Sequence, residues 1–173
     1  MTDAPEFPPM RHFEPGPGSD REFRDALSRF GTGVTIVTTA TEQGPIGITA
    51  NSFTSVSLDP PLVLWSAALK SKRFPHFADA EHLAIHVLAQ DQDELCWAFS
   101  KSKDAFHDID WMPSEHGVPL IQGCLARFEC QNYARYDGGD HAIIVSRVMN
   151  ISFREGDPLL FFGGSMGRFA QSA

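Results

Sequence analysis

The sequence of 173 residues is poor in positive charge, in cysteine and in long apolar runs. Its 14 Lys and Arg against 22 Asp and Glu give a formal net charge of −8, which argues against nucleic acid or an anionic membrane surface as the main partner. No stretch approaches the roughly 20 apolar residues that span a bilayer, and the N-terminus has no apolar signal region. We therefore expect a soluble protein that has neither nucleic acid nor a membrane as its partner.

The three cysteines, Cys96, Cys124 and Cys130, are an odd number and contain no CxxC pair. Such usage fits reduced thiols better than a disulfide framework, so we expect a cytoplasmic protein. His82 and His86 stand four residues apart, but no nearby Cys, Asp or Glu completes an obvious ligand set. No metal site is expected.

Several common catalytic and nucleotide-binding motifs are also missing. The chain has no GxGxxG after a strand, no GxxxxGK[ST], no HExxH and no GxSxG. Rossmann, P-loop, zinc-protease and serine-hydrolase interpretations therefore have no support. Glycines cluster at 31–33, 138–139 and 163–167, but taken alone such clusters most often form turns.

What the chain does contain suffices for one folded domain. It is 42% hydrophobic with 14 Phe, and its length allows a single sizeable core. Prolines at positions 5, 8, 9, 15 and 17 with few aliphatic neighbours predict a flexible tail over residues 1–18. Residues 19–173 are expected to form the domain.

Hydrophobic periodicity predicts short strands with a few short helices. Helices are expected from Ser19 to Gly31, at 71–80 and at 91–100, with Ser19 and Glu22, and Asp91 and Glu94, as capping boxes. The face of the first helix carries Phe23, Ala26, Leu27 and Phe30. Strands are expected at 34–39, 46–50, 62–65, 83–88, 124–131, 141–153 and 159–162, with turns at 41–45 and 137–140. Because strands and helices do not alternate regularly, the pattern favours an antiparallel β-barrel.

Alternation along 124–131 predicts that Cys124 and Cys130 share one strand face, where they serve as core packing. The segment from Gly44 to Trp65 is more informative, because a strand runs into a polar Thr, Asn and Ser segment before a Pro-led strand. Small residues and hydroxyls at a strand end offer backbone N–H groups and short donors to a planar, heteroatom-rich ligand. A capped loop is the alternative interpretation.

This segment, preceded by FGTGVTIVTT at 30–39, resembles the flavin reductase-like, FMN-binding split-barrel family. The resemblance continues through Asp110-Trp111, GVPLIQGCLA at 117–126, FEC at 128–130, GDH at 139–141 and PLLFF at 158–162. It covers about residues 20–169 and implies a mainly β, Greek-key antiparallel split β-barrel with a few short helices.

The resemblance implies an NAD(P)H-dependent flavin reductase, an enzyme that transfers a hydride from NADH or NADPH to FMN or FAD and supplies reduced flavin to a partner monooxygenase. Relatives in the family are homodimers, so a homodimer is expected. The cofactor carries the chemistry, so no catalytic side chain is expected. Two rival functions stay open: a split-barrel flavoprotein whose tightly held flavin acts directly on a small molecule, and a non-catalytic flavin-binding protein.

The resemblance also implies the residues of the site. It places the flavin ring and ribityl chain beside Gly47, Ile48, Thr49, Asn51, Ser52, Ser66 and Ala67. It places the phosphate end at Ser71, Lys72 and Arg73, where two cations and a helix start suit an anion, although a solvated helix face is the plain alternative.

Three further positions match the family near the cofactors. Phe99 matches an aromatic residue beside the flavin, although its helical spacing with Leu95 fits plain core equally well. His141 matches the His of a Gly-Asp-His turn on the nicotinamide side, and could equally cap a strand. The terminal loop from Gly163 to Arg168, with Ser165 and Arg168, is expected near the dinucleotide.

The chain departs from the family at two places. Many relatives carry Tyr or Arg where Ser165 and Met166 stand, which leaves the mode of nicotinamide binding open. Ser146 stands where relatives commonly have Gly, and we expect a structural role for it.

Overall fold

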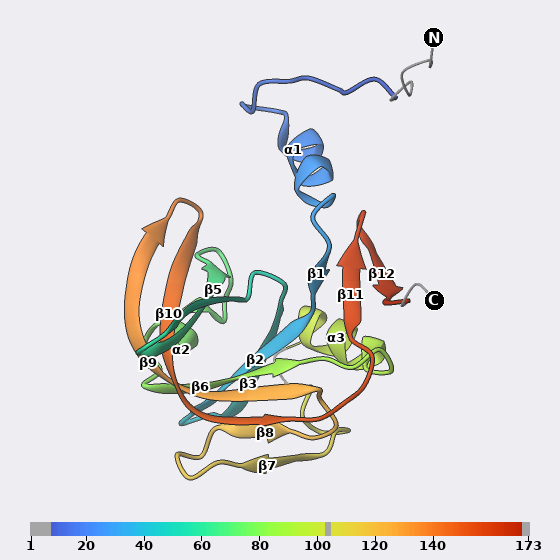
Figure 1. Ribbon diagram of the computed structural model, residues 1–173. Helices are drawn as coiled ribbons and strands as arrows, with labels where there is room; N and C mark the ends of the chain where they lie inside the picture. Colours follow the sequence, from blue (N-terminus) through green and yellow to red (C-terminus); the bar gives the residue numbers. More distant parts are fainter. Residues whose placement is uncertain (1–7, 103–104, 171–173) are drawn as a thin grey trace.

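A curved, seven-stranded sheet forms the centre of the computed structural model, which describes residues 8–102 and 105–170 (Figure 1). In spatial order its strands are β3 (Gly44–Ala50), β2 (Thr35–Thr41), β6 (His82–Val87), β9 (Ala126–Gly138), β10 (His141–Phe153), β5 (Pro61–Ala68) and β4 (Thr54–Leu58). Every hydrogen-bonded pair in this sheet is antiparallel. The mainly β, antiparallel fold with short helices is confirmed.

Two smaller sheets and three helices complete the part of the chain that the structure describes. One sheet contains β1 (Thr32–Gly33), β11 (Leu159–Phe162) and β12 (Ser165–Arg168), and the other contains β7 (Trp111–Pro113) and β8 (Pro119–Ile121). The helices are α1 (Asp20–Leu27), α2 (Phe74–Ala78) and α3 (Asp93–Lys101). None of the described helices is long and apolar enough to cross a bilayer.

The central strands are buried on both sides, which explains their dense Ile, Val and Thr content. In β2, five successive residues from Thr35 to Thr39 are buried. Their hydroxyls are satisfied by carbonyl oxygens: Thr38 Oγ1 donates to Pro119 O at 2.6 Å and Thr39 Oγ1 to His82 O at 2.8 Å. Burial of these threonines therefore leaves no hydroxyl without a partner.

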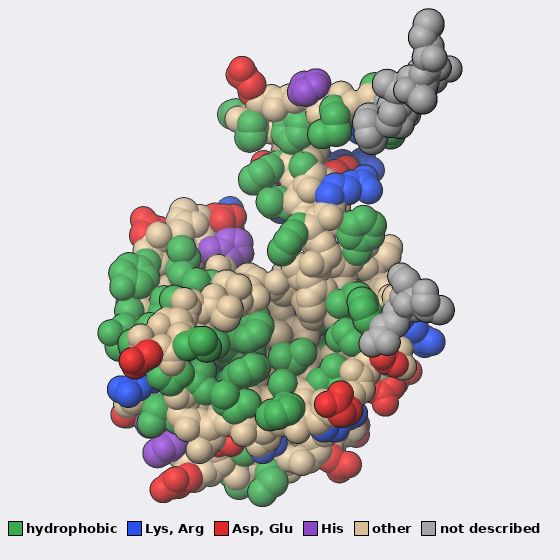
Figure 2. Space-filling view, viewed as in Figure 1, with side chains coloured by type: hydrophobic (Ala, Val, Ile, Leu, Met, Phe, Trp, Pro, Cys, Tyr) green, Lys and Arg blue, Asp and Glu red, His purple; other side chains and the backbone are tan. Residues whose placement is uncertain are grey.

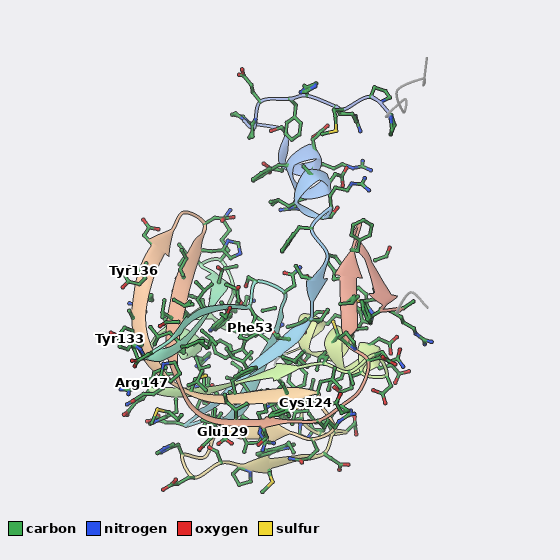
Figure 3. The ribbon with its side chains drawn as sticks, in the orientation of Figure 1. Phe53, Cys124, Glu129, Tyr133, Tyr136 and Arg147 are labelled. Carbon is green, nitrogen blue, oxygen red and sulfur yellow. The ribbon has the colours of Figure 1, made fainter. Side chains whose placement is uncertain are left out.

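Aromatic contacts fill the two larger core clusters. Inside the barrel, the rings of Trp65 and Phe77 meet edge to face with centroids 5.3 Å apart. Figure 3 shows Phe53 within the barrel, where its ring centroid lies 5.4 Å from that of Phe128. A second cluster, around Phe99, lies beneath α3. These contacts pack the interior of the barrel closely.

Ser146 has the structural role expected of it. Its side chain is fully buried, and its Oγ donates to Asn132 Oδ1 at 3.1 Å. The Asn132 amide nitrogen in turn donates to Phe77 O and Ala80 O, so the pair ties β10 and β9 to α2 and its following turn.

Both predicted capping boxes are wrong. Ser19 makes no capping bond to α1, because its Oγ is engaged by the backbone N–H and carbonyl of Gly16 in the preceding turn. Asp91 lies within the turn from Ala89 to Gln92, so α3 begins at Asp93 with Gln92 at its N-cap and no side-chain cap. In both cases a local turn ahead of the helix takes the place of the cap.

The predicted pairing of Cys124 and Cys130 on one strand face is also wrong. Gly123 adopts a φ of +77°, and the turn there delays the start of β9 until Ala126. Cys124 therefore precedes the strand and its Sγ lies 3.5 Å from Ile121 O, whereas Cys130 is buried in the barrel.

Helix α1 projects away from the barrel (Figure 1) and ends at Leu27 rather than at Gly31. None of its residues is buried, and Phe23, Leu27 and the following Phe30 are exposed. Residues 8–16 of the expected tail contain neither helix nor strand and are exposed, whereas residues 1–7 lie outside the described part. Among the described residues, the apolar face predicted for this helix is therefore not buried against the barrel.

Candidate functional site

A cleft of about 450 Å³ opens between the ends of β3 and β5 and the turn that joins β9 to β10. The residues that line it come from these three places: Ile48, Thr49, Ala50, Asn51, Ser52, Trp65, Ser66, Ala67, Ala68, Gly138, His141 and Ile143. Of the residues expected at the site, the cleft brings together Ile48, Thr49, Asn51, Ser52, Ser66, Ala67 and His141.

The pair Ser52 and Ser66 holds the two sides of the cleft together. Strands β3 and β5 are not neighbours in the sheet, yet the sheet curves until the chain after β3 meets β5. There the Ser52 Oγ accepts from Ser66 N at 2.9 Å and donates to Ser66 O at 3.2 Å. The Ser52 side chain thus makes the hydrogen bonds to β5 that the backbone of a neighbouring strand would otherwise make, at the point where the barrel is split between β3 and β5.

The lining suits a planar, mostly apolar ligand with polar edges. Apolar side chains come from Ile48, Ala67 and Ile143, and the small residues beside them let a ligand approach the backbone. Polar groups come from Asn51 and the two serines, and no carboxylate is among the lining residues. The lining itself therefore adds no negative charge, despite the net charge of −8 on the whole chain.

The Gly139–Asp140 turn between β9 and β10 forms the rim that carries His141. The His141 Nδ1 lies 2.7 Å from Asp140 Oδ1, and this hydrogen bond lowers the pKa of the exposed Asp140 carboxyl. The carbonyl oxygen of Asp140 accepts from Leu69 N at 3.0 Å, and His141 pairs with Ala68 in the ladder. The rim is thereby fixed to the end of β5.

Gly47 and Phe99 lie behind the cleft rather than in it. Phe99 is fully buried in the core cluster beneath α3, with its ring edge to face against Phe106. A Cβ built at Gly47 would lie 2.4 Å from Phe99 Cε1, so only glycine lets this ring pack on the strand. Thr49 Oγ1 donates to Cys96 O at 2.7 Å and joins the same helix to the same strand.

The segment from Ser71 to Arg73 follows β5 but does not line the cleft. Ser71 Oγ accepts from Arg73 N at 3.2 Å, and Lys72 is exposed. The Arg73 guanidinium points inward, donating to carbonyl oxygens of Gly47, Phe99 and Ser100. Partial burial lowers its pKa from the ordinary value.

Ser165 and Arg168 lie on β12, in a hairpin with β11 that turns at Gly163 and Gly164, whose φ values are +60° and +82°. Both side chains are exposed and neither lines the cleft. A second hollow of about 490 Å³ separates this hairpin from α1, and Asn51 lines both hollows. The hairpin therefore stands beside the cleft without closing it.

Sequence reasoning missed Trp65, Ala50, Ala68, Gly138 and Ile143 in the lining. A signal for Ala68 exists, because it follows Ser66 at the two-residue period of a strand. Ile143 reaches the cleft because it pairs with Ser66, a register that no local pattern shows.

Among the described residues, no group of three or more His, Cys, Asp and Glu side chains is arranged to hold a metal ion. His86 is fully buried and lies between Ile36 O, 3.0 Å from its Nδ1, and Ile121 N, 3.1 Å from its Nε2. Its role is to join β6 to its neighbours in the core.

Comparison with known proteins gives consistent matches. Residues 27–170 match the family model described as flavin reductase like domain. A protein of Agrobacterium fabrum named FMN reductase (NADH) SmoA is 53% identical over 171 residues, covering 99% of this chain and 98% of that protein. The reductase subunit HsaB of a flavin-dependent monooxygenase of Rhodococcus jostii is 40% identical over 146 residues, covering 83% and 75%.

A solved structure with the same architecture is the NADH:FAD oxidoreductase SgcE6 of Streptomyces globisporus C-1027 in complex with NAD and FAD fragments. It superposes with a TM-score of 0.86 at 38% sequence identity, covering 93% of this chain and 99% of that one. The expected split-barrel fold is thereby confirmed.

Proposed function

Because this chain belongs to the flavin reductase-like domain family, we propose that it transfers a hydride from NADH to FMN and supplies reduced flavin to a separate monooxygenase. The observation that carries the proposal is the cleft between β3 and β5, with its apolar walls, hydroxyl edge and lack of carboxylates. NADH is favoured over NADPH by the names of both relatives that match almost end to end. FMN is favoured over FAD because the relative named an FMN reductase is 53% identical, whereas the NADH:FAD oxidoreductase is 38% identical.

The residues present fit a flavin. The cleft volume of about 450 Å³ lies within the range of small-molecule sites. Ile48, Ala67 and Ile143 would contact the ring faces, while Asn51 and Ser66 would meet its polar edge. Outside the cleft, Ser71 and the exposed Lys72 stand on the turn after β5 and would meet the phosphate.

The protein's part in the reaction is orientation rather than covalent catalysis. A bound flavin supplies a ring nitrogen that accepts the hydride. The Ser52 and Ser66 bridge joins the two walls, and the Phe99 ring and the hydrogen bond from Thr49 Oγ1 to Cys96 O join β3 to α3 behind them. His141 and the β11–β12 hairpin, with Ser165 and Arg168, stand on the side proposed for the nicotinamide.

Anaerobic mixing of the protein with FMN and NADH tests this proposal. We expect rapid bleaching of the flavin's visible absorbance that depends on the protein and saturates with FMN. Bound flavin that NADH does not bleach would instead support a non-catalytic flavin-binding protein.

The exposed apolar surface supports a homodimer. On β10, the outward row Met149, Ile151 and Phe153 is exposed, and Phe153 keeps 80% of its surface. Tyr133 and Tyr136 point away from the barrel on β9 (Figure 3). Figure 2 shows hydrophobic side chains gathered on the barrel and on projecting α1. Burial of this surface in a second copy would offset its exposure, and sedimentation equilibrium should give twice the monomer mass of 19.1 kDa.

The absence of disulfide bonds among the three cysteines supports the proposal of a cytoplasmic location. Cys96, Cys124 and Cys130 are all free, and burial raises the pKa of Cys130 to about 12, which leaves it unreactive. We take residues 19–173 as the reductase domain and residues 1–18 as a tail outside it.

A further inference from the structure

The Arg73 side chain is directed into the protein rather than toward solvent. Its Nη1 donates to Gly47 O at 3.0 Å and to Phe99 O, and its Nη2 donates to Ser100 O at 3.1 Å. Gly47 belongs to β3, whereas Phe99 and Ser100 belong to the last turn of α3. One guanidinium therefore joins the cleft strand to the end of a helix that is 26 and 27 residues away in sequence.

These partners suit a cation. The last carbonyl groups of a helix lack intrahelical partners, and the helix dipole places partial negative charge on them. The planar fork of arginine spreads its N–H donors over separate nitrogens, so it can reach carbonyl oxygens on two elements at once, whereas the three donors of a lysine radiate from a single nitrogen. Arg73, which lies outside the helix, thus caps the C-terminal end of α3.

The same strand and helix are held at two further points. The Phe99 ring packs directly on the backbone of Gly47, where a Cβ would come within 2.4 Å. Two residues along β3, Thr49 Oγ1 donates to Cys96 O at 2.7 Å. The stretch from Gly47 to Thr49 is therefore fixed on its rear side, and its next residues, Ala50 and Asn51, line the cleft.

We propose that Arg73 is a positioning residue that sets the flavin-binding strand by joining Gly47 to the end of α3, and that Lys72 rather than Arg73 is available to the flavin phosphate. This inference rests on the proposed flavin binding. The family resemblance assigns Lys72 and Arg73 together to the phosphate, whereas the proposal gives the two residues different roles. Lys72 is exposed, whereas three Arg73 hydrogen bonds already go to carbonyl oxygens.

Comparison of FMN with riboflavin tests the assignment, because the two ligands differ only in the phosphate. Dissociation constants are measured by flavin fluorescence for the wild type and for Arg73→Lys, Lys72→Ala and Gly47→Ala, and circular dichroism verifies that each variant is folded. Arg135→Ala is a matched control, because the Arg135 Nη1 also donates to a carbonyl at a helix end, Ala78 O, and Arg135 does not line the cleft.

Arg73→Lys should weaken FMN and riboflavin by the same factor, about tenfold, since it keeps the charge but loses hydrogen bonds to the strand and helix. Gly47→Ala should do the same by displacing Phe99. Lys72→Ala should weaken the binding of FMN but not of riboflavin, and Arg135→Ala should leave the binding of both ligands unchanged.

Two results would overturn the assignment of Arg73 while leaving flavin binding intact. In the first, Arg73→Lys binds both ligands as the wild type does. In the second, Arg73→Lys loses affinity for FMN and keeps it for riboflavin, which would make Arg73 a phosphate ligand. A wild-type protein that binds neither ligand would overturn the proposed function as well.

Discussion

His86 should make the stability of this protein fall steeply as the solution becomes acidic. Its ring is fully buried, and burial lowers its pKa from 6.5 to about 4, although the hydrogen bond to Ile36 O opposes this. The Nδ1 donates to Ile36 O, so Nε2 is the acceptor for the Ile121 N–H at 3.1 Å. A second proton on the ring would make Nε2 a donor as well, so that the Nε2–H and the Ile121 N–H would face each other with no acceptor between them.

The sign and size follow from the two pKa values. The unfolded chain binds the proton first, near pH 6.5, so stability present above that pH is lost as the pH falls toward 4. The separation from 6.5 to about 4 corresponds to about 3 kcal/mol in total. About 2 kcal/mol of this should be lost by about pH 5.

Urea unfolding of the wild type and of His86→Gln at about pH 8 and about pH 5 measures this loss. A glutamine oxygen can still accept from Ile121 N, so the variant should fold, with lower stability at high pH and a smaller loss on acidification. His107→Gln, at an exposed histidine, should keep the wild-type pH dependence. If His86→Gln loses as much unfolding free energy as the wild type between the two pH values, His86 is not the cause.

Three further predictions concern the core, the cleft and the tail. Ser146→Ala should lower the free energy of unfolding by about 1 kcal/mol in urea, because Asn132 Oδ1 loses its buried donor; unchanged stability would contradict the role given to this pair. Ala68→Phe should fill the cleft and raise the KM for FMN without lowering the melting temperature, and an unchanged KM would place the flavin elsewhere. Deletion of residues 1–18 should leave the rate of NADH oxidation unchanged, and a large loss of rate would show that the tail contributes to the site.

The strands that sequence patterns predict are those with dense Ile and Val content. Runs such as 34–39 and 141–153 appear in the structure as β2 and β10, because branched residues buried on both faces leave a strong local signal. Strand β4, Thr54–Leu58, was not predicted, since its alternating serines are typical of a loop as well. Strand β12 contains Gly167 and is paired only with β11, so a glycine-rich loop was expected there.

In the candidate site too, some features could be predicted from the local sequence and others depend on the tertiary structure. The segment around Ile48 and Asn51 could be predicted to bind a ligand, because both its polar composition and its resemblance to the family are properties of a few consecutive residues. The Ser52 and Ser66 bridge depends on the curvature of the whole sheet. The inward direction of Arg73 depends on where α3 ends, which no pattern near residue 73 contains.

Steady-state NADH oxidation by the purified protein, followed by the loss of NADH absorbance with and without added FMN, tests the central claim most directly. A protein that transfers hydride to diffusible flavin should show a rate that is negligible without FMN and saturates as FMN is added. A rate that is absent with FMN, or that does not depend on added flavin, would contradict the account.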